Sequence, residues 1–501
     1  KNLIDALKVV GIEIPHFCYH PALGADGNCR MCLVGIEDGR PPLVPACKTP
    51  AQEGMKVQLD AEHIKKIQRD VLEFELINHP VDCPVCDQAG ECALQDYYMN
   101  YSLDDSRMRV DQVTKGKRMD FGSGVVHDQE RCVLCGRCVR FTRQITKTGE
   151  LGIVNRTDAA RVSIFPGRPL NNRYALNIVD ICPVGAMTSS DFRFKQRVWF
   201  LKKDPGICHG CSRGCSIYID HHQEKYKDDV IYRYRARTNL NVNGYFICDP
   251  GRLSYADENQ NRQTTTVVDG RLIGFDEGIE ALRERFDRAR KPLMLISPDC
   301  SLEQMWAVKR IAALYGADLS GYSDSYVVDG DGDDYLINDD KAANRRGLEL
   351  LDIDFSREQF IANLQHTDLL VNFNNDLFFG GVDEELKSQL DKTQSIAVCS
   401  HQLPVYESAA VLLPTASYSE YGGTIVNEDY VLQRFEKALF KNQDPKDILE
   451  ITRLLGGAII DAPHAWPGIR QSVARLADID PGAIPAEGIN LQNSEDTNVG
   501  A

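Results

Sequence analysis

The chain has 501 residues, more than a single hydrophobic core usually supports, so two or more domains are expected. Its apolar fraction of 43 % and charged fraction of 26 % are ordinary for globular proteins. The net charge of −16 argues against a nucleic-acid binder, because phosphate binding needs a basic surface. No apolar run approaches the length of a membrane span, and no secretory signal is found.

Cysteine usage is the most informative feature of the composition. Fifteen of the 17 cysteines lie between Cys18 and Cys248, in tight groups within a long acidic chain. This pattern favours metal or cluster ligation in a reducing cytosol over disulfides, and the odd total agrees with it. The other two, Cys300 and Cys399, are solitary, and we expect both to be inert buried thiols.

The N-terminal segment Asn2–Gly11 has the pattern of an amphipathic helix, and we expect the natural start of the protein to precede Lys1. From there to about residue 255, short strands and helices alternate with cysteine loops. These stretches contain too little apolar sequence for a large core. Small domains of this kind need a staple, which bound clusters supply.

The first ligand set combines one short Cys-x2-Cys pair with a distant cysteine on each side: Cys18, Cys29, Cys32 and Cys47. This resembles the plant-type ferredoxin arrangement with a longer first gap, and it predicts a [2Fe–2S] cluster, with a structural zinc as the alternative. Gly24 and Gly27 would let backbone amides approach the sulfurs. His16 and His20 flank Cys18, but four cysteines complete the set, so we interpret both as structural.

The second set contains three cysteines and one histidine: His79, Cys83, Cys86 and Cys92. Cys3His is also a zinc pattern, and spacing alone leaves zinc and [4Fe–4S] equally open. The context favours the cluster, because zinc has no redox chemistry and would interrupt a relay of redox centres.

The third set has two successive gaps of two residues and is closed by a Cys-Pro cysteine: Cys132, Cys135, Cys138 and Cys182. This is the bacterial ferredoxin pattern for [4Fe–4S]. No second triplet accompanies Cys182, so one cluster is expected here. Arg131, Arg137 and Arg140 add positive charge, which would raise the reduction potential, although surface or interface roles are equally open for them.

The fourth set is Cys208, Cys211, Cys215 and Cys248. It predicts another [4Fe–4S] cluster, and a zinc ribbon is a serious alternative. Gly210, Gly214 and Gly251 are consistent with tight loops around either metal centre.

Beyond residue 255, longer apolar strands alternate with amphipathic helices. The sequence predicts strands at Pro292–Ser297, Asp368–Phe373 and Gln394–Ser400, and a helix at Leu302–Tyr315. Strand–helix alternation predicts an α/β domain with a mainly parallel sheet. The tail after Ala462 is expected to be irregular.

Other functional motifs are missing from the sequence. There is no Gly-x-Gly-x-x-Gly after a strand, no Walker-type loop and no recognisable Ser/His/Asp grouping. The acidic segment 329–340 resembles an EF-hand loop, but it lacks glycine at the sixth position and ends in Asp340 rather than Glu. An exposed acidic loop is the favoured interpretation over a calcium site.

With the four sets in this order, the chain resembles the large iron–sulfur subunit (the G subunit) of bacterial NADH:quinone oxidoreductase, respiratory complex I. The resemblance is carried by three motifs: Pro15 to Pro21 with Gly27 to Cys32, His79 to Cys92, and Arg131 to Phe141. The fourth set resembles the extra off-path cluster of many bacterial members. Val411 to Pro414, Gly422 to Thr424 and Asn427 resemble a molybdopterin oxidoreductase fold that has lost its cofactor.

The resemblance implies a fold class of α+β iron–sulfur modules followed by an α/β domain. It implies a β-grasp [2Fe–2S] domain without its first hairpin (1–75), a small helical His/Cys3 module (76–115), a ferredoxin-like [4Fe–4S] module (116–200), a small [4Fe–4S] domain (201–255) and a truncated molybdopterin-oxidoreductase-like domain (256–501).

The resemblance also implies a function: an electron relay without a substrate site of its own, inside an NADH:quinone oxidoreductase. Its cofactors would be one [2Fe–2S] and three [4Fe–4S] clusters. Its partners would be the flavin- and NADH-binding subunit and the downstream cluster-bearing subunits, on the cytoplasmic side of the bacterial inner membrane, without a membrane span. Two alternatives remain at this point: a subunit of an NAD-linked formate dehydrogenase or hydrogenase, and a zinc-stapled scaffold.

Overall fold

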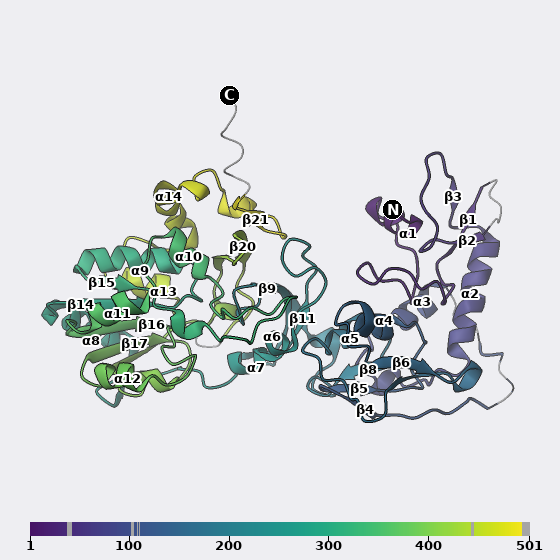
Figure 1. The fold of residues 1–501 in the computed structure, drawn as a ribbon, viewed down its shortest axis with the longest axis horizontal. Helices are drawn as coiled ribbons and strands as arrows, with labels where there is room; N and C mark the ends of the chain where they lie inside the picture. Colours follow the sequence, from purple (N-terminus) through teal and green to yellow (C-terminus); the bar gives the residue numbers. More distant parts are fainter. Residues whose placement is uncertain (38–42, 102–104, 108, 110, 442–444, 493–501) are drawn as a thin grey trace. The chain divides into compact units, whose positions relative to one another are not determined.

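The structure is a computed structural model in which residues 1–37, 43–101, 105–107, 109, 111–441 and 445–492 are described. The chain divides into two units, Lys1–Leu201 and Lys202–Ala501 (Figure 1).

The first unit opens with a small sheet in the order β2-β1-β3, beside the helices α1 and α2. The bounds are α1 Leu3–Val9, β1 Leu33–Ile36, β2 Leu43–Pro45, β3 Val57–Gln58 and α2 Glu62–Leu76. Helix α1 confirms the amphipathic helix predicted near the N-terminus. It begins where the side chain of Asn2 accepts the amide of Asp5, and its buried face is Leu3 and Ile4.

The rest of the first unit is built around helix α3 and two further antiparallel sheets, of order β4-β5-β8 and β6-β7. The bounds are α3 Ala93–Tyr101, β4 Met119–Gly122, β5 Val125–His127, α4 Arg137–Gln144, β6 Leu151–Val154, β7 Arg161–Ile164, α5 Asn177–Ile181 and β8 Met187–Ser189. Cysteines themselves contribute to a buried cluster in this unit together with Phe17, Met31 and Leu72. The cysteine loops are therefore part of the core.

The second unit opens with an antiparallel sheet of order β11-β10-β9 and two short helices. The bounds are β9 Lys202–Ile207, β10 Ser216–Gln223, β11 Asp229–Ala236, α6 Asp249–Leu253 and α7 Tyr255–Glu258. His221 of β10 is fully buried and connects the three strands. Its Nε2 lies 2.7 Å from Asp204 Oδ2, and its Nδ1 lies 2.8 Å from Asp229 Oδ1.

A seven-stranded sheet of order β13-β12-β18-β17-β16-β14-β15 forms the centre of the second unit. Its strands are β12 Thr266–Val268, β13 Arg271–Ile273, β14 Pro292–Ile296, β15 Asp318–Ser320, β16 Leu369–Phe373, β17 Gln394–Cys399 and β18 Val411–Pro414. β18, β17, β16, β14 and β15 are parallel, and β12 and β13 pair antiparallel at one edge. The predicted strands and the mainly parallel sheet are confirmed.

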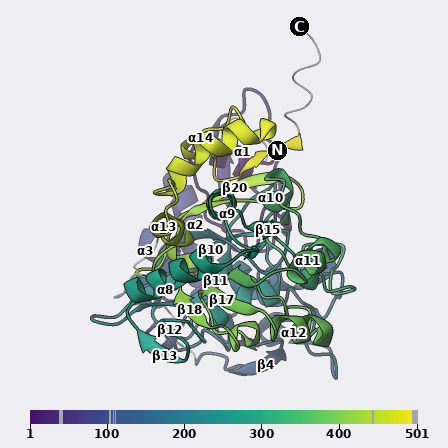
Figure 2. The ribbon, with the colours of Figure 1, turned by 90° about the vertical axis from the view of Figure 1, so that its left-hand side faces the viewer.

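Helices cover both faces of this sheet, as parallel sheets require. One face packs in a core with α8 Phe275–Arg288, α9 Leu302–Tyr315, α13 Ile448–Leu454 and α14 Ala462–Ser472. The other face packs with α11 Arg357–Leu364 and α12 Glu384–Leu390. Figure 2 shows α8 and α13 on one side of β17 and β18, and α11 and α12 on the other. Helix α9 has the predicted bounds, with a capping box at Ser301 and Gln304 and a left-handed Gly316 after its last residue.

The prediction of an irregular tail after Ala462 is wrong, because helix α14 begins at this residue. Asp461 caps the helix, and proline is tolerated in its first turn. Trp466 and Ile469 bury one face in the main core, which stabilises the helix despite Pro467 in its interior. The remaining elements are α10 Arg345–Leu350 and a sheet of β19 Gly423–Val426, β20 Val431–Phe435 and β21 Ile489–Asn490.

Candidate metal centres

The four cysteines of the first set converge between the loop before β1 and the loop after β2. Cys32 Sγ lies 3.4 Å from Cys47 Sγ, and the thiol of Cys18 hydrogen-bonds to Cys29 and Cys47. The hydrogen bond with Cys47 lowers the pKa of Cys32 to about 7, against the effect of burial. Backbone amides, including that of Gly27, also approach Cys18. Four thiols in close contact with amide donors match the donor chemistry of a [2Fe–2S] centre.

The two histidines beside Cys18 are held by local backbone contacts. His16 Nδ1 lies 2.7 Å from the carbonyl oxygen of Ile14, and the amide of Ala22 donates to His20 Nδ1 at 3.2 Å. These contacts agree with the structural role predicted for both residues.

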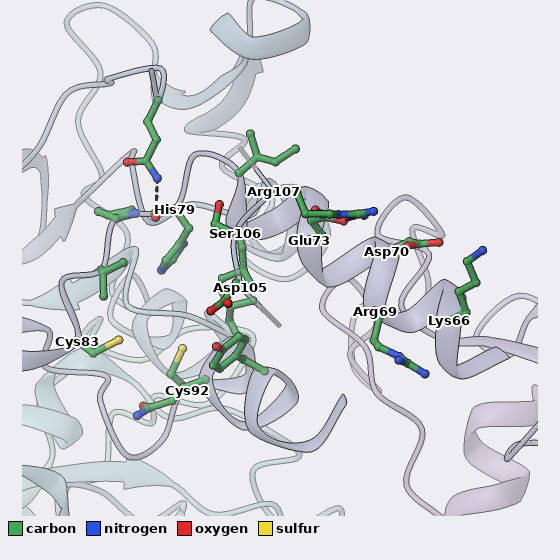
Figure 3. Close-up of a pocket in the computed structure, with 18 residues that line it drawn as sticks. Lys66, Arg69, Asp70, Glu73, His79, Cys83, Cys92, Asp105, Ser106 and Arg107 are labelled. Carbon is green, nitrogen blue, oxygen red and sulfur yellow. Dashed lines mark hydrogen bonds and ion pairs between the residues drawn. The ribbon is translucent and has the colours of Figure 1, made fainter. Parts of the chain in front are cut away.

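The second set surrounds the turn between α2 and α3. His79, Cys83 and Cys92 line a cavity of about 720 Å³, and Figure 3 shows their side chains pointing into the same space. No group of three or more His, Cys, Asp or Glu side chains in the described part of the chain is arranged around a single metal-ion position. The backbone of Cys86 is fixed by Arg197, whose Nη1 donates to the carbonyl oxygen of Cys86 at 2.9 Å.

The third set is assembled by helices α4 and α5. Cys138 lies in the first turn of α4, which follows the left-handed Gly136, and Cys182 directly follows α5. Burial raises the pKa of Cys135 to about 12, and amides near Cys182 work against the effect of burial on its thiol. Buried thiols with raised pKa values need a cation or a cluster to stay deprotonated. A [4Fe–4S] centre would supply this stabilisation.

The first and third sets are joined by side chains that cross between their loops. Arg140 Nη1 donates to the carbonyl oxygens of Leu23 at 3.0 Å and Gly24 at 2.8 Å, and Nη2 donates to that of Cys18. Asn28 donates to the carbonyl oxygen of Leu134 at 3.2 Å. The loops of the first and third sets are therefore direct neighbours.

The third and second sets are joined by the loop after Cys182. The amide of Ala93, next to Cys92, donates to the carbonyl oxygen of Pro183 at 2.9 Å. A Cβ at Gly185 would lie 2.1 Å from Cys86 Sγ. Only a glycine leaves room for this sulfur, so the third loop forms one wall of the second site. In space, the sets follow the order first, third, second.

Arg131 has a different role from the other two arginines. Its guanidinium lies 3.1 Å from Asp82 Oδ2 and 3.2 Å from Asp128 Oδ2, so two carboxylates offset its charge. The sequence drew attention to the three arginines but not to their partners. Gly185 and Ala93 were not predicted, because their importance depends on contacts between segments distant in sequence.

The fourth set belongs to the second unit. Cys208 follows β9, Cys211 and Cys215 precede β10, and Cys248 caps α6. Amides donate to two of the sulfurs: Gly210 to Cys208 at 3.4 Å and Gly251 to Cys248 at 3.3 Å. A Cβ at Gly251 would lie 3.0 Å from Cys208 Sγ and 3.1 Å from Cys248 Sγ. Gly210 and Gly251 therefore form tight loops beside the sulfurs, as predicted for them.

Segments from the C-terminal part of the second unit cover this fourth set. The amide of Ser212 donates to the carbonyl oxygen of Asp340 at 2.9 Å, and Gln433 donates to that of Gly214 at 2.9 Å. His209 stacks on Tyr418 with ring centroids 4.1 Å apart. The fourth site is therefore part of the core of the second unit.

The acidic segment 329–340 uses its carboxylates internally. Asp331 pairs with Lys341 at 2.6 Å, Asp340 pairs with Arg345 at 2.5 Å, and Asp333 accepts three successive backbone amides. These contacts favour the interpretation as an acidic loop. Cys300 and Cys399 are buried, as predicted, and burial raises the pKa of Cys399 to about 12.

These cysteine loops define a protein with several iron–sulfur modules, and three family models match the segments of the first three sets in order. They are a 2Fe-2S iron-sulfur cluster binding domain at residues 1–62, an NADH-ubiquinone oxidoreductase-G iron-sulfur binding region at 68–107, and an NADH-quinone oxidoreductase subunit 3 ferredoxin-like domain at 122–188. No helix in the described ranges is long and apolar enough to cross a membrane.

The relatives agree with these matches. The G subunit of the NADH-quinone oxidoreductase of Streptomyces coelicolor is 39 % identical over 268 residues, covering 53 % of this chain and 31 % of the relative. That of Escherichia coli K12 is 33 % identical over 324 residues, covering 62 % and 35 %. The chain is thus homologous to the G subunit of NADH-quinone oxidoreductase, which confirms the resemblance, and the match spans about a third of these relatives' length.

Among solved structures, a chain of an NAD+-reducing [NiFe]-hydrogenase in the H2-reduced state is similar at 27 % identity. The match covers 39 % of this chain and 84 % of that chain, with a TM-score of 0.35.

Proposed function

We propose that the chain is the electron-relay subunit of an NADH:quinone oxidoreductase. It would take electrons from a flavin-bearing partner at the [2Fe–2S] centre and pass them through the all-cysteine [4Fe–4S] centre to the His-ligated one. From there they would reach downstream cluster-bearing subunits that reduce quinone. The bound clusters supply one-electron redox chemistry, and the chain supplies their positions and surroundings.

The order in which the loops of the three sets contact one another carries this proposal. Arg140 and Asn28 join the first loop to the third, and Ala93 and Gly185 join the third loop to the second. An electron relay needs adjacent centres in a defined order, whereas separate zinc staples would have no need for it. Homology to the NADH-quinone oxidoreductase relatives supports the same order of modules.

We further propose the finer features implied by the resemblance. The ligands are the sixteen residues of the four sets, and the cofactors are one [2Fe–2S] and three [4Fe–4S] clusters. The domain boundaries at 75, 115, 200 and 255, the β-grasp form of the first domain and the truncated, cofactor-free molybdopterin-like fold of residues 256–501 belong to this proposal. So does a peripheral place on the cytoplasmic side of the bacterial inner membrane.

Metal analysis of the full chain, purified without oxygen, tests the proposal. We expect iron and acid-labile sulfide in equal amounts, and distinct [2Fe–2S] and [4Fe–4S] signals in the EPR spectrum after reduction. In the assembled complex, NADH should reduce these centres. Four zinc ions and no iron would refute the relay and leave a zinc-stapled scaffold.

A further inference from the structure

Arg137 connects the surroundings of two candidate centres through one side chain. Its Nη2 donates to the carbonyl oxygen of Tyr19 at 2.6 Å, and its Nη1 donates to that of Ile181 at 3.0 Å. Tyr19 directly follows Cys18 of the first set, and Ile181 directly precedes Cys182 of the third. The guanidinium therefore lies between the backbone segments that present one ligand of each centre.

The charge of this guanidinium is not cancelled locally. Within the described ranges its hydrogen bonds go to carbonyl oxygens, in contrast to Arg131, which lies between two carboxylates. Arginine stays protonated at any pH at which the protein is folded. Because the side chain is part-buried, its field is screened less than that of a surface cation.

One N–H donor of Arg137 has no acceptor among the described residues. Among the described residues its Nε is buried and has no hydrogen-bond partner. A buried N–H without an acceptor is costly, and native proteins rarely leave one unsatisfied. Cluster sulfides and cysteine thiolates can accept a hydrogen bond from such an N–H. Hydrogen bonds to the sulfurs are one determinant of the reduction potential of a cluster.

We propose that Arg137 is a shared positioning residue that raises the reduction potentials of both the [2Fe–2S] and the all-cysteine [4Fe–4S] centre. Each centre gains negative charge on reduction, and one uncompensated cation beside both favours the reduced state of each. This inference rests on the proposed relay function. Arg140 differs from Arg137, because among the described residues its guanidinium donates to carbonyl oxygens of the first loop, those of Cys18, Leu23 and Gly24.

EPR-monitored redox titration of the full chain with its clusters bound tests the proposal. In Arg137→Gln, the midpoint potentials of both centres should fall. In Arg137→Lys, both should fall by less, because an ammonium keeps the charge but not the two-sided contact. The matched control is Arg143→Gln, which removes an exposed charge from the same helix α4 and should leave both potentials unchanged.

Several outcomes would overturn the inference. A fall in only one potential in Arg137→Gln would mean that the residue is not shared, and no fall would mean that it does not set potentials. An equal fall in Arg137→Lys and Arg137→Gln would indicate a purely structural role. If Arg137→Gln does not retain iron, Arg137→Lys decides, and potentials identical to wild type refute the proposal. Absence of iron from the wild-type protein would instead refute the relay function itself.

Discussion

Gly185→Ala is the substitution for which the structure makes the sharpest prediction. The added Cβ would lie 2.1 Å from Cys86 Sγ and 3.1 Å from Gln88 Cβ. Non-bonded heavy atoms are at rest about 3.5–4.0 Å apart, so the sulfur or the loop must move by about 1.5 Å. Overpacking of this kind typically costs about 1–3 kcal/mol. Metal–ligand distances tolerate deviations of only about 0.2 Å, so we expect loss of the His-ligated cluster.

The assay is iron and sulfide analysis with EPR of the reduced full chain. Gly185→Ala should lose the iron and sulfide of one [4Fe–4S] cluster together with its EPR signal, while the [2Fe–2S] signal remains. The control is Gly152→Ala in β6, where a Cβ would meet only Phe165 Cζ at an ordinary 3.8 Å, and full iron is expected. Unchanged iron and an unchanged spectrum in Gly185→Ala would refute the claim that the third loop forms a wall of the second site.

Further substitutions test other parts of the structure. His79→Cys should retain its cluster with a changed midpoint potential in the redox titration, and an identical spectrum would mean that His79 is not a ligand. His221→Leu should lower the free energy of unfolding by about 3–5 kcal/mol in urea titrations, since Asp229 then stays buried without its partner. In the wild type, burial opposes protonation of His221, but the two carboxylates it contacts raise its pKa overall. The stabilisation of the fold by protonated His221 should therefore be complete below pH 6.5 and decline as the pH rises through the raised pKa. A free energy of unfolding that stays constant over this pH range would contradict the prediction. Cys399→Ala should leave the iron content unchanged, whereas Cys182→Ala should lose the iron of one cluster; iron loss from Cys399→Ala would contradict its role as an inert thiol.

Features determined by short stretches of sequence could be predicted. Helix α9 matches its expected bounds because its capping residues and apolar spacing are local signals. Strand β14 was recognisable because a run of five residues buried on both faces is typical of a parallel strand. The same holds for the cysteine sets, because ligand spacing is a local property of each loop.

Features that depend on tertiary contacts could not be predicted. Helix α14 was missed because the tail after Ala462 is rich in Pro, Gly, Asn and Asp, while the burial of Trp466 that stabilises the helix depends on distant segments. Gly185 contacts Cys86, about a hundred residues earlier in the chain. Arg137 contacts Tyr19, which is also about a hundred residues earlier, and Ile181, which is several tens of residues later. A single sequence shows that these residues are present but not which segments they meet.

The packing of the fourth cysteine set has a consequence for biogenesis. Domains usually fold in the order in which they leave the ribosome. The loops of the first three sets are completed by contacts within Lys1–Leu201, so the clusters proposed for them could be inserted while the rest of the chain is still being made. The Cys208–Cys215 loop must wait for Tyr418 and Gln433, about two hundred residues later, before it is covered. During synthesis, the thiols of this loop would thus stay uncovered longest, and insertion of the cluster proposed for this site would come last.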